Sequence, residues 1–167
     1  MTPEDVRRLF AYNALAFDRV WGCIEQITDE QFLEDVDYSR GSVRNQMLHI
    51  VTGMERWMQR LKGESPGPGP AEDDFPIRAA VRARWEQTTT EFGAYLKTLD
   101  QTGLNETVLG RLAGRGADYA SRRSDLLLHL ANHSTDHRAQ VLAILHSEFQ
   151  VPTVEQDMLL YLIEAAG

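Results

Sequence analysis

Three of the five histidines in this chain, His129, His133 and His137, recur at every fourth position within the stretch 126–145. On a helix, four residues advance the side-chain direction by about 400°, so the three side chains lie one above the other on nearly the same face. The spacing places successive imidazoles about 6 Å apart, which lets two of them reach one divalent metal ion. Metal binding is therefore the first chemistry to consider.

A helical wheel separates these histidines into two kinds. With Leu130 at its centre, the apolar stripe extends about 60° to either side and contains Leu126, His133, His137, Val141 and Ile144. His129 lies at the edge of the stripe, about 100° from Leu130, and His146 points to the opposite side, where solvent is expected. His133 and His137 are thus expected in the core.

A buried pair of histidines has two interpretations. A lone imidazole in a core is usually a hydrogen-bonded structural residue, and a polar core network would explain His133 and His137 in the same way. Two neutral imidazoles in a dry core are costly, however, unless they share a partner such as a metal ion. The stretch leaves both interpretations open, and a third ligand would decide between them.

Apolar residues at spacings of three and four predict the helices that must position these side chains. The first helix begins after the capping residue Thr2 and ends near residue 26, and the second occupies residues 42–63. The stretch 63–76 is rich in proline and glycine and is predicted to be a loop that crosses between helices. A third helix is expected over residues 77–99.

The remaining segments give weaker patterns. Residues 107–121 contain two short runs around a glycine turn, which favour a β-hairpin, although coil is the alternative. The histidine stretch follows as the fourth long helix. Pro152 and Thr153 are then expected to open a final helix that docks on the others through Met158, Leu159, Tyr161, Leu162 and Ile163.

The position of His49 on the second helix is ambiguous. Its wheel angle is well over 100° from the centre of the apolar stripe, between Gln46 and Gly53, so periodicity alone predicts a flank residue. Helix crossing can bring one flank toward a neighbouring helix, and Gly53 one turn away would leave room there. The sequence pattern permits a site role for His49 without requiring it.

Composition bounds the class of protein. The 167 residues are 43% apolar, which suits one globular domain over residues 1–167. The 17 basic and 25 acidic residues give a net charge of -8, and no basic stripe interleaved with aromatics appears, so nucleic acid is a poor partner. Cys23 is the only cysteine, and no internal disulfide can form.

The chain carries no sign of a membrane partner. Its first residues, MTPEDVRR, are charged and lead into an amphipathic segment, so they lack the apolar core of a secretory signal. No window approaches 18 apolar residues, which predicts that no segment spans a membrane. The sequence therefore predicts a cytoplasmic protein.

Four segments, taken in order, carry a family resemblance: AYNALAFDRV, RGSVRNQMLHIVTGMERWMQRLKGE, LLLHLANHSTDHRAQV and VPTVEQDMLLYLIE. Together they resemble the DinB family, also described as DinB/YfiT-like metalloenzymes, over almost the whole chain. The resemblance implies an all-α fold, an up-down four-helix bundle with an additional C-terminal helix. It also implies a metal held by three histidines, which correspond here to His49, His133 and His137.

Two positions depart from the family pattern. Ala139 stands where the family commonly has glycine, a small change that leaves the ligands intact. Asp136 stands where a second histidine is often found, and an acidic side chain there is expected to change the local charge or a substrate contact. The family name refers to DNA-damage induction and implies no DNA binding, in agreement with the acidic composition.

The implied ligand set predicts catalysis in preference to a closed structural site. Three neutral nitrogens leave a 2+ ion with open positions for water or substrate, and zinc and nickel both suit such ligands. A bound water would serve a small-molecule hydrolase, and a bound thiolate a low-molecular-weight thiol S-transferase, as the resemblance implies. The alternative is a non-catalytic metal-binding or stress-response bundle protein.

The sequence singles out no general base. Gln140, one turn beyond His137, is the best candidate to orient a ligand or a water, and Asn13 and Asp136 are weaker ones. Arg138 is expected to be solvated. The catalytic residues therefore stay unassigned at this level.

A homodimer is also predicted. The first helix places Tyr12, Leu15 and Trp21 partly outside its buried stripe, and the last helix has apolar residues on more than one side. Such a surface exceeds what a monomer needs to expose. The alternative is that the segment before the histidine helix covers these residues within one chain.

Overall fold

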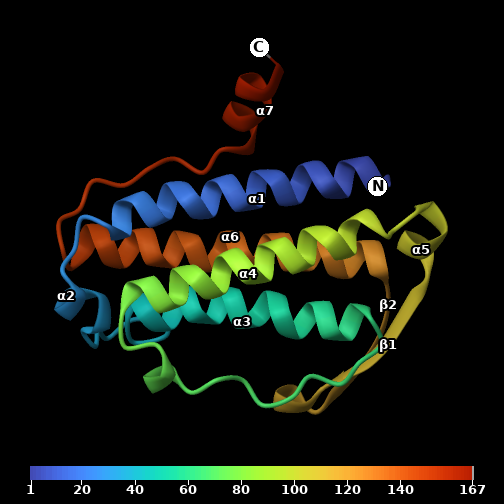
Figure 1. The fold of residues 1–167 in the computed structure, drawn as a ribbon, viewed down its shortest axis with the longest axis horizontal. Coiled ribbons are helices and arrows are strands. Elements are labelled where there is room, and N and C mark those ends of the chain that lie inside the picture. Colours follow the sequence, from blue (N-terminus) through green and yellow to red (C-terminus); the bar gives the residue numbers. More distant parts are fainter. Residues whose placement is uncertain (167) are drawn as a thin grey trace.

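Helices form most of the chain, and one small hairpin interrupts them (Figure 1). The computed structural model describes residues 1–166. Within that range it has seven α-helices and a two-stranded sheet: α1 (Pro3–Ile24), α2 (Asp29–Leu33), α3 (Val43–Leu61), α4 (Arg78–Lys97), α5 (Gln101–Asn105), β1 (Thr107–Leu112), β2 (Ala117–Arg122), α6 (Arg123–Ser147) and α7 (Met158–Ala166). The mainly helical prediction is confirmed, and the segment before α6 forms the hairpin that its sequence favoured over coil.

The long helices begin where capping chemistry predicts. Thr2 accepts from the backbone N–H of Asp5 at 3.1 Å, and Asp5 returns a bond to the Thr2 backbone N–H at 2.9 Å. Ser42 likewise accepts from the Asn45 backbone N–H at 3.0 Å. Because these bonds satisfy donors that a helix start leaves unpaired, they fix the first residues of α1 and α3.

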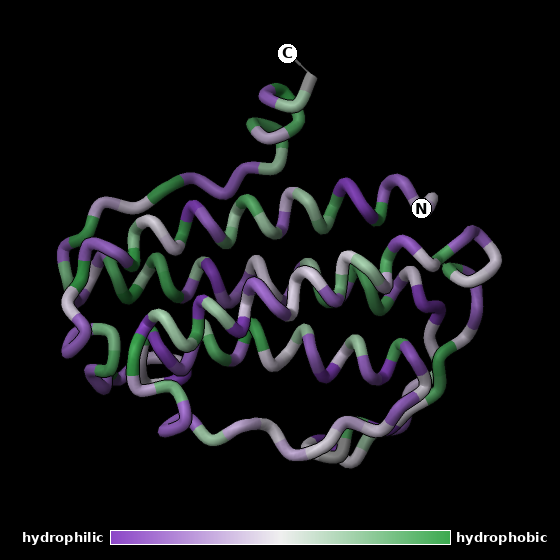
Figure 2. The backbone as a smooth tube through the Cα atoms, viewed as in Figure 1, coloured by the Kyte–Doolittle hydropathy of each residue, from purple (hydrophilic) through white to green (hydrophobic). Residues whose placement is uncertain are grey.

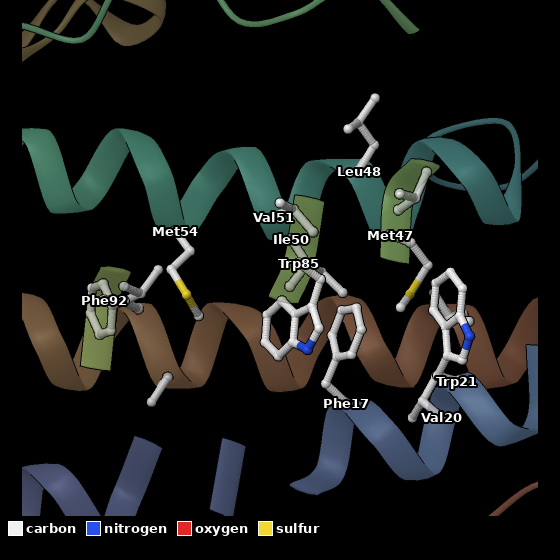
Figure 3. Packing of buried hydrophobic residues seen from close by; sticks show 14 of the residues in the cluster. Phe17, Val20, Trp21, Met47, Leu48, Ile50, Val51, Met54, Trp85 and Phe92 are labelled. Atoms are coloured by element: carbon white, nitrogen blue, oxygen red, sulfur yellow. The ribbon is translucent and has the colours of Figure 1, made fainter. Parts of the chain in front are cut away.

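The core lies between α1, α3, α4 and α6 (Figure 1). Aromatic packing is central to it: the rings of Phe17 and Trp85 stack with centroids 3.6 Å apart, and Met47 and Met54 of α3 point toward the same layer (Figure 3). Figure 2 shows apolar and polar residues alternating along the long helices, as expected when each buries one face. No helix of the described residues is both long and apolar enough to cross a membrane.

The predicted up-down alternation is wrong for the pair α3 and α4. Glu55 of α3 meets Arg84 of α4 at 2.6 Å, and further along both helices the Leu61 carbonyl accepts from Tyr95 at 3.3 Å, so the two helices run in the same direction. The physical reason is the crossover after α3, which returns along the length of the molecule before α4 begins (Figure 1). A loop that long permits either direction.

The predicted start of the last helix is also wrong. Residues 152–157 are non-helical, and α7 begins only at Met158. The Oε1 of Gln156 accepts from the Arg138 guanidinium at 2.7 Å, and its backbone carbonyl accepts from the Tyr12 hydroxyl. These bonds hold the segment extended against α1 and α6, so the helix starts after them.

The hairpin crosses one end of α3. Strands β1 and β2 are antiparallel, with Gly110 opposite Tyr119. A side chain at Gly110 would collide with the Tyr119 ring, which explains the glycine in a strand. The hairpin thus lays an aromatic residue and a tight turn beside α3, next to Trp57, whose ring centroid is 5.9 Å from that of Tyr119.

Candidate metal centre

The structure brings His49, His133 and His137 together. One potential ligand atom from each lies within 4.8 Å of the other two, and no other histidine, cysteine, aspartate or glutamate of the described residues joins this group. The ring centroids are 4.4 Å apart for His49 and His137, 4.4 Å for His133 and His137, and 5.1 Å for His49 and His133. Helix α3 therefore supplies one imidazole and helix α6 supplies two, and all three meet at one place.

Helix crossing explains how His49 reaches the pair. Residue 53 lies one turn from His49 on α3, and a Cβ built on Gly53 would lie 3.4 Å from Cε1 of His133. The His133 ring therefore packs directly against α3 at residue 53. The wheel placed His49 on a flank, and that flank is the one that faces α6.

His137 is held in a defined orientation. Its Nδ1 lies 3.0 Å from Gln46 Oε1 and 3.1 Å from Gln140 Oε1, and both of these are acceptors, so Nδ1 carries the proton and Nε2 keeps its lone pair. Gln46 in turn donates to Gln140 Oε1 at 2.8 Å, and Ser39 donates to the same oxygen at 2.7 Å. Such a network fixes the tautomer and the orientation of the His137 ring.

Sequence reasoning found Gln140 and missed Gln46. The expected orienting role of Gln140 agrees with its contact to His137, but Gln46, which is fully buried, makes the shorter contact. The signal was present: Gln46 precedes His49 by three residues and so shares its helix face.

All three imidazoles are neutral at pH 7. Burial, with Arg40 as the next cause, lowers the pKa of His49 to about 3. Burial and the neighbouring His137 lower the pKa of His133 to about 4, and burial lowers that of His137 as well. Because desolvation disfavours the charged form, the lone pairs remain available to a cation.

The residues present fit a divalent metal. Nδ1 of His133 is buried and has no hydrogen-bond partner among the described residues, which is costly for a polar atom. Nε2 of His49 accepts from the Arg40 guanidinium at 3.1 Å, because arginine only donates, so this nitrogen carries a lone pair that a metal would take in place of Arg40. Three neutral nitrogen donors at one point are a set that transition metals use.

The other sequence candidates lie outside the group. His146 is exposed on α6, as predicted, and His129, which was expected at the edge of the apolar stripe, is exposed and packs edge-on against Trp57 at 5.2 Å. Asp136 is exposed and accepts from Gln140 at 3.3 Å. Asn13 is buried and accepts from Arg138, on the side of α6 that faces α1.

The expectation that Arg138 is solvated is wrong. This side chain is fully buried and donates to Asn13, Thr135 and Gln156. It points toward α1 and the C-terminal segment, away from the histidines. Arg138 therefore belongs to the packing of α6, and burial lowers its pKa to about 10, which leaves it charged at neutral pH.

A pocket of about 260 Å³ opens onto the histidine group. His49 and His133 line one side of it, Trp57 lines another, and Leu112 and Gly114 of the hairpin region cover it. The pocket gives a small molecule access to two of the three imidazoles. The hairpin, which carried no functional signal in the sequence, is thus part of the site.

Comparison with known proteins agrees with these observations. The model of the DinB family matches residues 1–148, a range that contains all three histidines and the hairpin and ends before α7. A search of curated proteins found no match.

Proposed function

Because the chain belongs to the DinB family, we propose that it binds a divalent metal ion, zinc or nickel, through His49, His133 and His137 and acts as an enzyme on small molecules. The observation that carries the proposal is the convergence of three neutral imidazoles beside a pocket that two of them line. A metal with three protein ligands keeps an open position, which is typical of catalytic sites.

The reaction that the site supports best is transfer of a low-molecular-weight thiol to an electrophile. When bound, the metal supplies a Lewis acid that favours the thiolate form of a thiol. Gln46 and Gln140 hold the His137 ring, while Trp57 and residues of the hairpin region line the pocket beside it. Asp136 is exposed and accepts from Gln140, and no carboxylate of the described residues joins the histidine group, so the site offers no clear general base of the kind that hydrolysis requires.

An assay with two substrates tests this proposal. Metal-loaded protein is given a thiol with 1-chloro-2,4-dinitrobenzene, in which the thiolate sulfur bonds to the aromatic carbon and chloride leaves, or it is given a p-nitrophenyl ester. We expect metal-dependent thioether formation, lost on chelation and in His133→Ala. Ester cleavage alone would instead identify a hydrolase. Full metal content without either activity would identify the alternative, a non-catalytic metal-binding protein.

We further propose a homodimer that pairs through α7. Leu159 and Ile163 are 60% and 61% exposed, and Figure 2 shows several apolar residues along this helix. The part of the prediction that relied on the first helix is wrong, because Tyr12 and Trp21 are buried, Tyr12 beside Tyr161 and Trp21 beside Phe17. The exposed face of α7 is what supports association.

A further inference from the structure

Three arginines surround the pocket above the histidine group. Arg56 comes from α3, Arg60 lies one turn later, and Arg115 comes from the turn of the hairpin. None of the three has a carboxylate within 4.0 Å among residues 1–166, whereas Arg84, also on the surface of these helices, binds Glu55 at 2.6 and 2.9 Å. The chain has a net charge of -8, so its composition alone would not lead one to expect three unpaired arginines at one pocket.

Arg56 and Arg60 are also close enough to repel each other. They stand four residues apart on one helix face, where like charges are destabilising. The Arg60 guanidinium lies over the Trp57 ring, 5.1 Å from its centroid, which fixes its plane at the pocket wall. The cost of this arrangement is relieved when an anion lies between the two guanidinium groups.

Two polar atoms beside the arginines lack partners. Nε of Arg60 and the hydroxyl of Tyr119 are both buried, and neither has a hydrogen-bond partner in the described part of the chain. Tyr119, Arg56 and Arg60 line an adjoining hollow of about 300 Å³. Unsatisfied donors at the wall of a cavity indicate that an acceptor from outside the protein completes them.

We propose that the pocket selects an anionic substrate, a small thiol bearing carboxylates that bind Arg56, Arg60 and Arg115 while its sulfur faces His49 and His133. This inference rests on the proposed function, because it names the substrate of the same site. The planar guanidinium matches a carboxylate through paired hydrogen bonds, which gives orientation as well as affinity. The arginines thereby distinguish an anionic thiol from a neutral one.

Two thiols that differ in charge test the inference. The cobalt(II)-loaded protein is titrated with mercaptosuccinate or with 2-mercaptoethanol, and the thiolate-to-metal absorption band reports each dissociation constant. In the wild type we expect mercaptosuccinate to bind at least about tenfold more tightly, since one hydrogen bond to a charged group contributes about that factor. In Arg56→Gln/Arg60→Gln, the ratio of the two constants should fall toward one.

Matched variants separate local from general effects. Arg8→Gln/Arg19→Gln removes the same charge from α1, where these arginines pair with Asp5 and Glu164, and should keep the wild-type ratio. Arg115→Gln, at an exposed turn that tolerates substitution, should lower the ratio even if the double variant at α3 does not fold. An equal affinity of the wild type for both thiols would overturn the inference about the anionic substrate. It would not contradict the proposal that the three histidines bind a metal.

Absence of a thiolate band with either thiol would overturn the metal proposal instead. Calorimetric titration of the metal-free protein with succinate then decides the anion inference alone. Heat of binding in the wild type and its loss in Arg56→Gln/Arg60→Gln would support it. No heat in the wild type would refute it.

Discussion

Replacement of the buried Arg138 by methionine should destabilise the protein without disturbing the group of His49, His133 and His137. The guanidinium is fully buried and donates to Gln156 Oε1 at 2.7 Å, to Asn13 Oδ1 at 2.5 Å and to Thr135 Oγ1 at 3.0 Å. No carboxylate of the described residues lies within 4.0 Å of it. Neutral oxygens alone therefore hold a charge inside the core.

The magnitude follows from two opposing effects. Three hydrogen bonds from a charged donor contribute about 1.5 kcal/mol each at the lower end of their range. Burial lowers the pKa of Arg138 to about 10 from 12.5, and this corresponds to a penalty of about 3 kcal/mol for the charged form. Methionine removes both effects and leaves Asn13 Oδ1 unpaired, at a further cost of about 1–3 kcal/mol. The net loss is thus about 2.5–4.5 kcal/mol.

Thermal unfolding of the metal-free protein, followed by circular dichroism, measures this loss. In a chain of this length the melting temperature should fall by about 5–15 °C. Arg19→Gln, which breaks an exposed pair with Glu164, should change stability by less than about 1 kcal/mol. Asn13→Leu/Arg138→Met should recover part of the loss, because the Asn13 oxygen that the single variant leaves unpaired is gone. A single variant as stable as the wild type would refute the reasoning.

Three further predictions concern the site and the assembly. Gln46→Met should weaken metal binding by about tenfold to a hundredfold, because it removes the shorter bond to His137. Gln59→Met on the same helix should leave metal binding unchanged. Competition with a chromophoric chelator measures the metal affinity of each variant. The protein should keep its metal at pH 5 and release it only below about pH 4, because His133 and His49 take up protons near pH 4 and 3 instead of 6.5. The stability of the metal-free protein should fall as the pH drops from 6.5 toward 4, because in this range these histidines are protonated in the unfolded chain and neutral in the folded one. Light scattering should give twice the chain mass of 18.9 kDa with and without chelator, and the single mass in Leu159→Asp/Ile163→Asp; a monomeric wild type would contradict the proposed dimer.

Single-helix patterns predicted what depends on one helix. The burial of His137 and the exposure of His146 follow from their angles on α6, and the caps at Thr2 and Ser42 follow from local hydrogen bonds. The family resemblance, and no pattern of the chain itself, supplied His49 as the third member of the group. Its wheel angle is informative only once the crossing of α3 and α6 is known.

Features that arise between segments distant in sequence were not predictable in this way. The parallel course of α3 and α4 depends on the path of the crossover, and periodicity does not encode a path. The late start of α7 depends on bonds from Gln156 to Arg138 and Tyr12, which join residues far apart in the chain. For the same reason Arg138 looked like a surface residue, although α1 and the C-terminal segment cover it.

Metal content of purified protein, measured by elemental analysis, tests the central claim most directly. We expect about one zinc or nickel ion per chain in the wild type and in His129→Ala and His146→Ala, whose side chains lie outside the group. His49→Ala, His133→Ala and His137→Ala should each lose the ion while keeping the helical circular dichroism spectrum, because the apolar core around them is intact. Wild-type metal content in any of these three variants, or its loss in His129→Ala alone, would contradict the site described by these histidines.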